Sequence, residues 1–130
     1  MRKTIVKGMT EIHEDGRATV SLFESADVST LLHESAHVMR RYLKAEDLYI
    51  FEQWMGVRDG IWLERHEECF ARGMERFFWD GVLIPKELEH MTESLRAIYP
   101  TAQDSSIHVE LPDEVRSTYA RMYRCHAGRR

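Results

Sequence analysis

The chain has 130 residues, 43% of them hydrophobic and 31% charged, which predicts one globular domain over residues 1–130 with a buried core. Its formal net charge of −4 gives no reason to expect nucleic-acid binding, and no apolar run is long enough to span a membrane. The first residues lack the apolar core of a signal peptide, and two cysteines (Cys69 and Cys125) are too few for a disulfide framework, so we expect a cytoplasmic protein with free thiols.

Residues 3–23 have the pattern of β structure. Residues 4–6 are a short β-branched run, and alternating segments at 9–13 and 18–23 flank Glu14-Asp15-Gly16-Arg17. Asp-Gly between two alternating segments is a strong hairpin signal. We therefore predict an N-terminal hairpin or small sheet packed on the helix that follows. The strand at 18–23 either shields the core only or offers an unpaired edge to an extended peptide.

A helix is predicted over residues 28–44, where no Gly or Pro intervenes and Asp27 or Ser29 can cap the first turn. A helical wheel shows a broad apolar arc made of Val28, Leu31, Leu32, Ala36, Val38, Met39, Tyr42 and Leu43. His33 and His37 lie beside this arc. We therefore expect one side of the helix to pack into the core and the histidines to open onto a cleft.

This helix contains the His-Glu-x-x-His motif at residues 33–37. Residues four apart are neighbours on one helix face, so His33 and His37 can present two imidazole nitrogens to one metal ion. Glu34 lies about 100° round the helix, where it can reach a metal-bound water without being a ligand. Two histidines, one oxygen ligand and an open position make a catalytic zinc site. The simpler alternative is an amphipathic helix with two surface histidines.

Four further helices are predicted, and they span residues 45–55, 61–80, 85–98 and 113–124. Gly81 is a natural C-terminal stop for the second, and Pro85 and Pro112 can open the third and the fourth. Residues 101–110 should form a loop with a briefly extended piece at 107–109, and residues 125–130 a frayed tail. The expected fold class is therefore α+β, mainly helical.

A third metal ligand must come from elsewhere in the chain. In one class of zinc sites, a Gly three residues and a His six residues after the second motif His complete the pattern, but Arg40 and Leu43 occupy these positions. The remaining candidate is a glutamate on a second helix that crosses the first. The long predicted helix offers Glu67, Glu68 and Glu75.

The two segments together resemble a known family. His33-Glu34-x-x-His37 followed on a later helix by Glu68-Cys69-Phe70-Ala71 is similar to gluzincin-type zinc metallopeptidases, and it looks most like the zincin-like domains of phage and mobile-element proteins. The resemblance covers about residues 17–124. It implies a minimal zincin-like domain, a Zn²⁺ ion held by His33, His37 and Glu68, and a location in the cytoplasm of a bacterium or a phage-infected host cell. Relatives often have an acidic residue four after the ligand, where this chain has Arg72.

A wheel of the long helix keeps two glutamates in contention as the ligand. Its apolar face consists of Leu63, Phe70, Met74, Phe77 and Phe78. Glu67 falls within that face, and a buried charge needs a partner, so it is a ligand candidate as well. Glu68 lies at the edge of the face, where ligands beside a core are expected. Glu75, two turns further on, either holds the second nitrogen of a ligand histidine or is a solvated helix charge.

The resemblance also implies a mechanism. Zinc lowers the pKa of a bound water towards ~7 and polarises a substrate carbonyl. Glu34, as general base, takes a proton from that water and passes it to the leaving amine. The expected function is therefore that of a zinc-dependent metallopeptidase, a hydrolase that cleaves peptide bonds in a peptide or protein substrate.

Two alternatives from other classes stay open. The chain can be a zincin-fold binding or structural module of a phage or mobile element with little or no peptidase activity, or a helical interaction domain in which the motif is a coincidence. The spacing does not select a donor for the oxyanion of the reaction. The candidates are His66, His90, His108, His126, Tyr99, Tyr119 and Tyr123.

Overall fold

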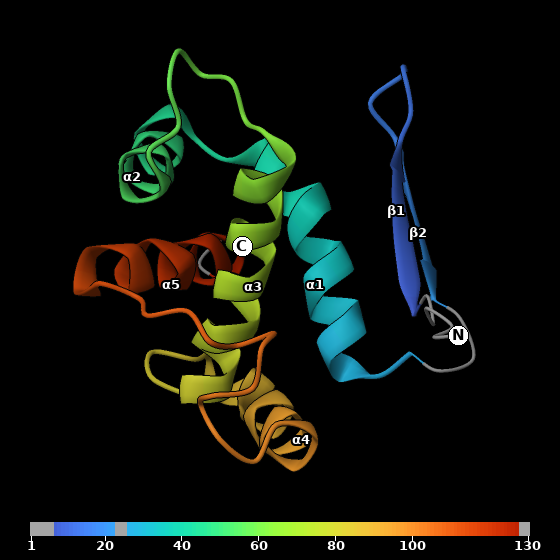
Figure 1. Cartoon of the computed structure of the whole chain (residues 1–130), viewed down its shortest axis with the longest axis vertical. Helices are drawn as coiled ribbons and strands as arrows, with labels where there is room; N and C mark the ends of the chain where they lie inside the picture. The colour runs from blue at the N-terminus through green and yellow to red at the C-terminus, as the bar shows by residue number, and fades with distance from the viewer. Residues whose placement is uncertain (1–6, 23–25, 128–130) are drawn as a thin grey trace.

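The computed structural model describes residues 7–22 and 26–127. Two strands and five α-helices lie within these residues: β1 (Gly8–Ile12), β2 (Ala18–Leu22), α1 (Val28–Met39), α2 (Ala45–Met55), α3 (Glu64–Asp80), α4 (Glu89–Ile98) and α5 (Asp113–Ala127). In Figure 1 α1 lies between the hairpin on one side and α3 on the other. The predicted mainly helical α+β fold, with an N-terminal hairpin on the motif helix, is confirmed.

The hairpin is antiparallel and its register pairs Gly8 with Leu22 and Ile12 with Ala18. Its turn passes through Gly16 at φ +90°, a left-handed conformation that favours glycine. Gly8 has a different role, because a Cβ at this position would come within 2.7 Å of the Cγ2 atom of Thr30 in α1. The missing side chain therefore lets β1 lie directly on the motif helix. The predicted strand residues 4–6 and 23 lie outside the described residues.

The core forms where α1, α2, α4 and α5 pack around α3. Its buried members include Leu32, Ala36, Phe51, Phe70, Met74, Phe77, Phe78, Leu95, Val115 and Tyr119. The Tyr119 ring lies 4.7 Å from Phe51 and 5.5 Å from Phe70, centroid to centroid, and its hydroxyl donates to the Phe70 carbonyl at 2.8 Å. Full burial of each large apolar side chain contributes about 1.5–3 kcal/mol, so this cluster fixes α3 in place.

The motif helix begins as predicted and ends early. Asp27 caps it, because its Oδ1 atom accepts a hydrogen bond from the Thr30 amide at 3.0 Å. The predicted end at residue 44 is wrong, since a 3₁₀ turn at Arg40–Tyr42 follows Met39 and the chain then leaves the helix in extended conformation. Tyr42 is 70% exposed rather than part of the core. Its hydroxyl instead donates to the Gly16 carbonyl at the hairpin turn.

Two other helix starts differ from the prediction. The long helix begins at Glu64 rather than at 61, because a bridge between Arg58 and Ile61 forms a turn just before it. Gly81, at φ +72°, ends this helix as predicted. A 3₁₀ turn at Lys86–Leu88 replaces the first turn predicted for the next helix.

Two predictions for the C-terminal part are also corrected. Residues 107–109 do not form an extended segment, and Ile107 is buried with its carbonyl accepting from Arg76 Nη1 at 3.0 Å. The last helix continues through Ala127, three residues beyond the predicted end at 124. Residues 128–130, and the side chains of Cys125 and His126, lie outside the described part of the chain. Cys69 is a free, half-buried thiol, as predicted.

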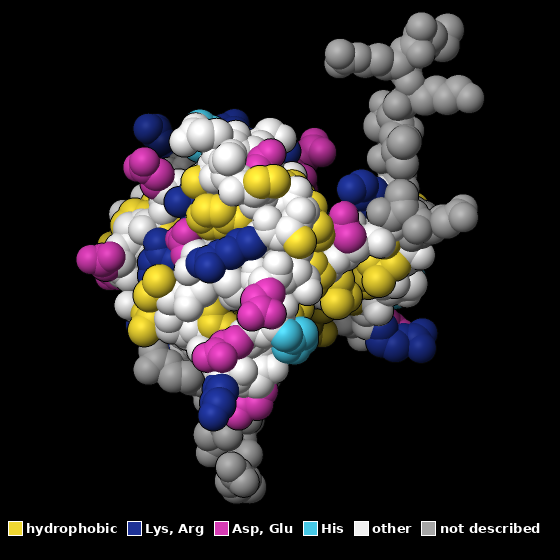
Figure 2. All heavy atoms as spheres, turned by 90° about the horizontal axis from the view of Figure 1, so that it is seen from below, with side chains coloured by type: hydrophobic (Ala, Val, Ile, Leu, Met, Phe, Trp, Pro, Cys, Tyr) yellow, Lys and Arg dark blue, Asp and Glu magenta, His cyan; other side chains and the backbone are white. Residues whose placement is uncertain are grey.

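The surface is mixed in character on the face shown in Figure 2, where acidic, basic and hydrophobic side chains are interspersed. No large area of a single charge stands out among the described residues on this face. None of the described helices has the length and apolar character needed to cross a membrane.

Candidate metal centre

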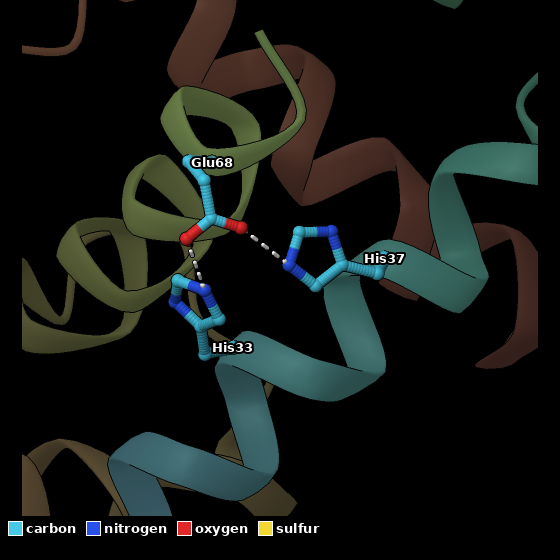
Figure 3. A group of neighbouring side chains, drawn as sticks. All are labelled: His33, His37 and Glu68. Carbon is cyan, nitrogen blue, oxygen red and sulfur yellow. Dashed lines mark hydrogen bonds and ion pairs between the residues drawn. The ribbon is translucent and has the colours of Figure 1, made fainter. Parts of the chain in front are cut away.

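Helices α1 and α3 bring together the three residues predicted as ligands (Figure 3). His33 and His37 project from successive turns of α1 towards the Glu68 carboxylate, which comes from the facing helix α3. The Nε2 atom of His33 lies 3.1 Å from Glu68 Oε1, and the Nε2 atom of His37 lies 3.0 Å from Glu68 Oε2. One ligand atom from each residue lies within 4.8 Å of the other two.

This geometry fits a metal ion. Nitrogen and oxygen ligands bound at about 2.0–2.2 Å in a tetrahedral site lie roughly 3.3–3.6 Å from one another. The observed nitrogen–oxygen separations of 3.1 and 3.0 Å are close to that value. The side chains are 19%, 18% and 36% exposed for His33, His37 and Glu68, so the group is sheltered but open on one side. The three residues can therefore hold a metal ion and leave a position free.

Glu75 lies directly behind His33. It is only 1% exposed, and its Oε2 atom lies 2.8 Å from His33 Nδ1. Its Oε1 atom accepts a hydrogen bond from Ser29, whose Oγ atom also lies 2.7 Å from the Tyr99 hydroxyl. Glu75 is therefore not a solvated helix charge. It holds the second ring nitrogen of a candidate ligand, which was the other role predicted for it.

The carboxylates around His33 change its protonation. Burial disfavours the charged imidazolium, but the hydrogen bond to Glu75 and the negative charges of Glu75, Glu68 and Glu34 outweigh it, so the pKa of His33 is raised above its ordinary value of 6.5. A metal binds neutral imidazole. Protons and a metal ion therefore compete for this histidine.

Glu67, the other ligand candidate, points to a different partner. It forms two hydrogen bonds with the Arg40 guanidinium, one of them from Nε at 3.1 Å. Burial raises the pKa of Glu67, but His37 and Arg40 outweigh this effect and lower it to about 2. The Oε1 atom of Glu67 lies 4.0 Å from His37 Nδ1, a charge contact too long for a hydrogen bond. Arg40 thus supplies the partner that Glu67 needs on a largely apolar face, and Glu67 lies outside the His33–His37–Glu68 group.

Glu34 is held by the hairpin. The hydroxyl of Thr10 in β1 lies 2.7 Å from Glu34 Oε1 and 3.0 Å from the Glu34 carbonyl. A hydroxyl has one proton, so it donates to one of these oxygens at a time. The sequence analysis missed Thr10. The signal that identifies it is the alternation of β1, which places Gly8, Thr10 and Ile12 on the face towards α1.

Two hollows flank the group, as expected for histidines that open onto a cleft. The larger, about 450 Å³, is lined by His33, Glu34, His37 and Glu68 together with Thr10, Ile12 and Arg41. The smaller, about 350 Å³, is lined by His33 and Glu34 together with Ser29, Glu75 and Tyr99. Both hollows therefore meet at the first two residues of the motif.

Only some of the candidate oxyanion donors lie near the His33–His37–Glu68 group. Tyr119 is buried against the Phe70 carbonyl, and the Tyr123 hydroxyl lies 3.1 Å from the sulfur of Met74, so neither faces the group. Tyr99 is the one candidate tyrosine that lines a hollow beside His33.

Three of the four candidate histidines, namely His66, His90 and His108, line neither hollow. His66 is buried and accepts a hydrogen bond from the Leu63 amide at the start of α3. His90 and His108 are exposed and line neither hollow. The side chain of His126 lies outside the described residues.

Comparison with known protein families, with curated proteins and with solved structures gives no match for this chain. The resemblance to zincin-like metallopeptidases therefore stays a prediction from two motifs. Any functional conclusion rests on the geometry of the site.

Proposed function

We propose that this chain is a zinc-dependent metallopeptidase that hydrolyses peptide bonds. The observation that carries the proposal is the Glu68 carboxylate of α3, which meets Nε2 of both motif histidines at 3.1 and 3.0 Å. A chance His-Glu-x-x-His on a surface helix has no reason to face a glutamate from another element. It has even less reason to have a second, buried glutamate behind its first histidine.

The donor set favours zinc over the other common divalent ions. Ca²⁺ and Mg²⁺ prefer oxygen ligands, whereas imidazole nitrogen suits zinc and related transition metals. Two histidines and one carboxylate, with a fourth position open, is a ligand set of catalytic zinc enzymes. His33, His37 and Glu68 would hold the ion, and Glu75 would orient His33 from behind.

The residues around the group support a role in amide hydrolysis. Zinc, when bound, supplies a Lewis acid that polarises a carbonyl and lowers the pKa of water. Glu34 lines both hollows, and Thr10 engages its Oε1 atom. Its other carboxylate oxygen then accepts the proton lost by the attacking water, holds it, and delivers it to the amine nitrogen that leaves.

One strand of the hairpin lies where an extended peptide substrate would bind. Two residues of β1, Thr10 and Ile12, line the larger hollow, whereas β2 contributes no lining residue to either hollow. The strand predicted for contact with an extended peptide was the second, at 18–23. We therefore assign this role to β1, whose backbone runs past Glu34.

The test is metal content measured by elemental mass spectrometry on protein purified without added metal. Wild type should carry about one zinc per chain, and His37→Ala and Glu68→Ala should lose it. Glu67→Ala is the matched control, one residue away on the same helix, and should keep the metal. A wild type without zinc, even after zinc is supplied and the excess removed, would overturn the proposal.

A second experiment separates a peptidase from a binding module. Zinc-loaded wild type and Glu34→Gln are incubated with a mixed peptide library, and new termini are identified by mass spectrometry. Hydrolysis by wild type that Glu34→Gln loses, with its zinc retained, supports the mechanism. Intact zinc with no hydrolysis of any peptide by wild type would instead favour the binding or structural module.

A further inference from the structure

Tyr99 stands at the end of a chain of hydrogen bonds that leads to His33. The Tyr99 hydroxyl lies 2.7 Å from Ser29 Oγ, Ser29 contacts Glu75 Oε1, and Glu75 Oε2 lies 2.8 Å from His33 Nδ1. These groups come from three elements, since Ser29 and His33 belong to α1, Glu75 to α3, and Tyr99 follows α4. This series of hydrogen bonds therefore connects the end of α4 to the candidate metal centre.

The chemistry of the groups fixes the direction of every bond in this chain. A carboxylate accepts hydrogen bonds and donates none. Ser29 must therefore donate its single proton to Glu75, and its oxygen is left to accept from the Tyr99 hydroxyl. His33 must likewise donate from Nδ1 to Glu75. When His33 is neutral, its Nε2 atom then carries the lone pair that a bound metal ion would take, on the side of the ring that faces Glu68.

The central bond of this series, between Ser29 and Glu75, is buried. Ser29 and Glu75 are both buried. The backbone of Tyr99 is fixed twice, because its carbonyl accepts from Trp79 Nε1 at 2.8 Å and its amide donates to the Leu95 carbonyl at 2.8 Å. The backbone from which the Tyr99 side chain extends is therefore held in place beside the smaller hollow, which Tyr99 lines.

We propose that Tyr99, acting through Ser29, is a positioning residue of the metal centre. It holds the Glu75 carboxylate so that His33 keeps the tautomer and ring orientation that aim Nε2 at the ion. The proposal rests on the proposed function in one respect, namely that the His33 group binds zinc. Loss of a direct outer partner of a ligand weakens metal binding about 10–100-fold, so loss of Tyr99, two hydrogen bonds further out than Glu75, should weaken it about 3–10-fold.

Zinc affinity, measured by competition with a chromogenic chelator, provides the first test. Tyr99→Phe keeps the ring and removes only the donor, and it should bind zinc about 3–10-fold more weakly than wild type. In a Ser29→Ala background the same substitution should have no further effect, because the connection to Glu75 is already cut. Tyr123→Phe is the matched control, a tyrosine whose hydroxyl donates to the sulfur atoms of Met39 and Met74. Wild-type affinity in Tyr99→Phe, or an equal loss with and without Ser29, would overturn the proposal.

The tautomer of His33 provides a second test that needs no zinc. Long-range ¹H–¹⁵N NMR on metal-free protein, at a pH where the ring is neutral, should find His33 protonated on Nδ1 in wild type. Tyr99→Phe should raise the fraction protonated on Nε2, whereas Tyr123→Phe should not. If the fraction of His33 protonated on Nε2 is the same in Tyr99→Phe as in wild type, the proposal is wrong, whether or not wild type binds zinc. The failure of this inference is thereby distinguished from failure of the zinc site.

Discussion

The hydroxyl of Thr10 lies 2.7 Å from Oε1 of Glu34 and links the hairpin to the glutamate between the two motif histidines. β1 can approach this closely because Gly8, two residues earlier, has no side chain to meet Thr30. The hairpin is therefore more than a cover for α1. It sets the orientation of the residue that the proposed mechanism uses to move protons.

Thr10→Val tests this role, because valine keeps the shape of threonine and loses the hydroxyl. A hydrogen bond to a charged group is worth about 1.5–3 kcal/mol, so we expect kcat/KM for a cleaved peptide to fall roughly tenfold or more. Zinc content should not change, since Thr10 is not among the ligand candidates. Thr19→Val, at an exposed position of β2, is the control and should be fully active. Unaltered kcat/KM in Thr10→Val would show that the bond does not orient Glu34.

Glu75→Gln tests the partner of His33. The amide has a donor NH₂ group in place of one carboxylate oxygen, so the two atoms that accept from Ser29 and from His33 can no longer both be acceptors. We expect zinc affinity, measured by chelator competition, to fall about 10–100-fold. Glu93→Gln, on the exposed face of α4, is the control and should bind zinc like wild type. Equal affinities in the two variants would contradict the assigned role of Glu75.

The raised pKa of His33 predicts opposite pH trends for metal binding and for metal-free stability. Zinc needs the neutral ring, so its affinity should fall as the pH drops through the His33 pKa, which lies above 6.5. In metal-free protein the folded state holds the proton more tightly than the unfolded state does. This contribution to stability is therefore fully present below 6.5 and is lost as the pH rises through the raised pKa.

Thermal unfolding of metal-free protein across this pH range, beside zinc titrations at the same pH values, measures both trends. Glu75→Gln should flatten the stability trend, because Glu75 supplies the largest of the effects that raise the His33 pKa. A metal-free protein that becomes more stable across this range, in wild type but not in Glu75→Gln, would contradict the assigned sign.

Local patterns in the sequence predict the parts of this fold that local chemistry decides. The Asp15-Gly16 turn, the Asp27 cap and the Gly81 stop all follow from backbone preferences of a few neighbouring residues. Likewise, the four-residue spacing of His33 and His37 places them on one helix face in any context.

What the sequence does not reveal depends on contacts between distant elements. The motif helix ends at Met39, five residues before the predicted end, where Arg40 turns towards Glu67 on α3. The choice between Glu67 and Glu68 depends on this same arginine, which no helical wheel of α3 contains. Thr10 and Tyr99 reach the site from the hairpin and from the end of α4, and only the packing of those elements on α1 shows it.

The Arg40–Glu67 ion pair should stabilise the folded protein near neutral pH, and this stabilisation should disappear in acid. The pKa of Glu67 is lowered from 4.5 to about 2, so its contribution is present above 4.5 and disappears as the pH falls towards 2. Arg40→Met should therefore be less stable than wild type at pH ~7, and the difference should shrink as the pH falls through this window. Urea denaturation at several pH values measures it, with the adjacent exposed residue in Arg41→Met as control. A difference that stays the same at every pH would assign the effect to the packing of Arg40 on the Trp62 ring instead, 4.5 Å away, and not to Glu67.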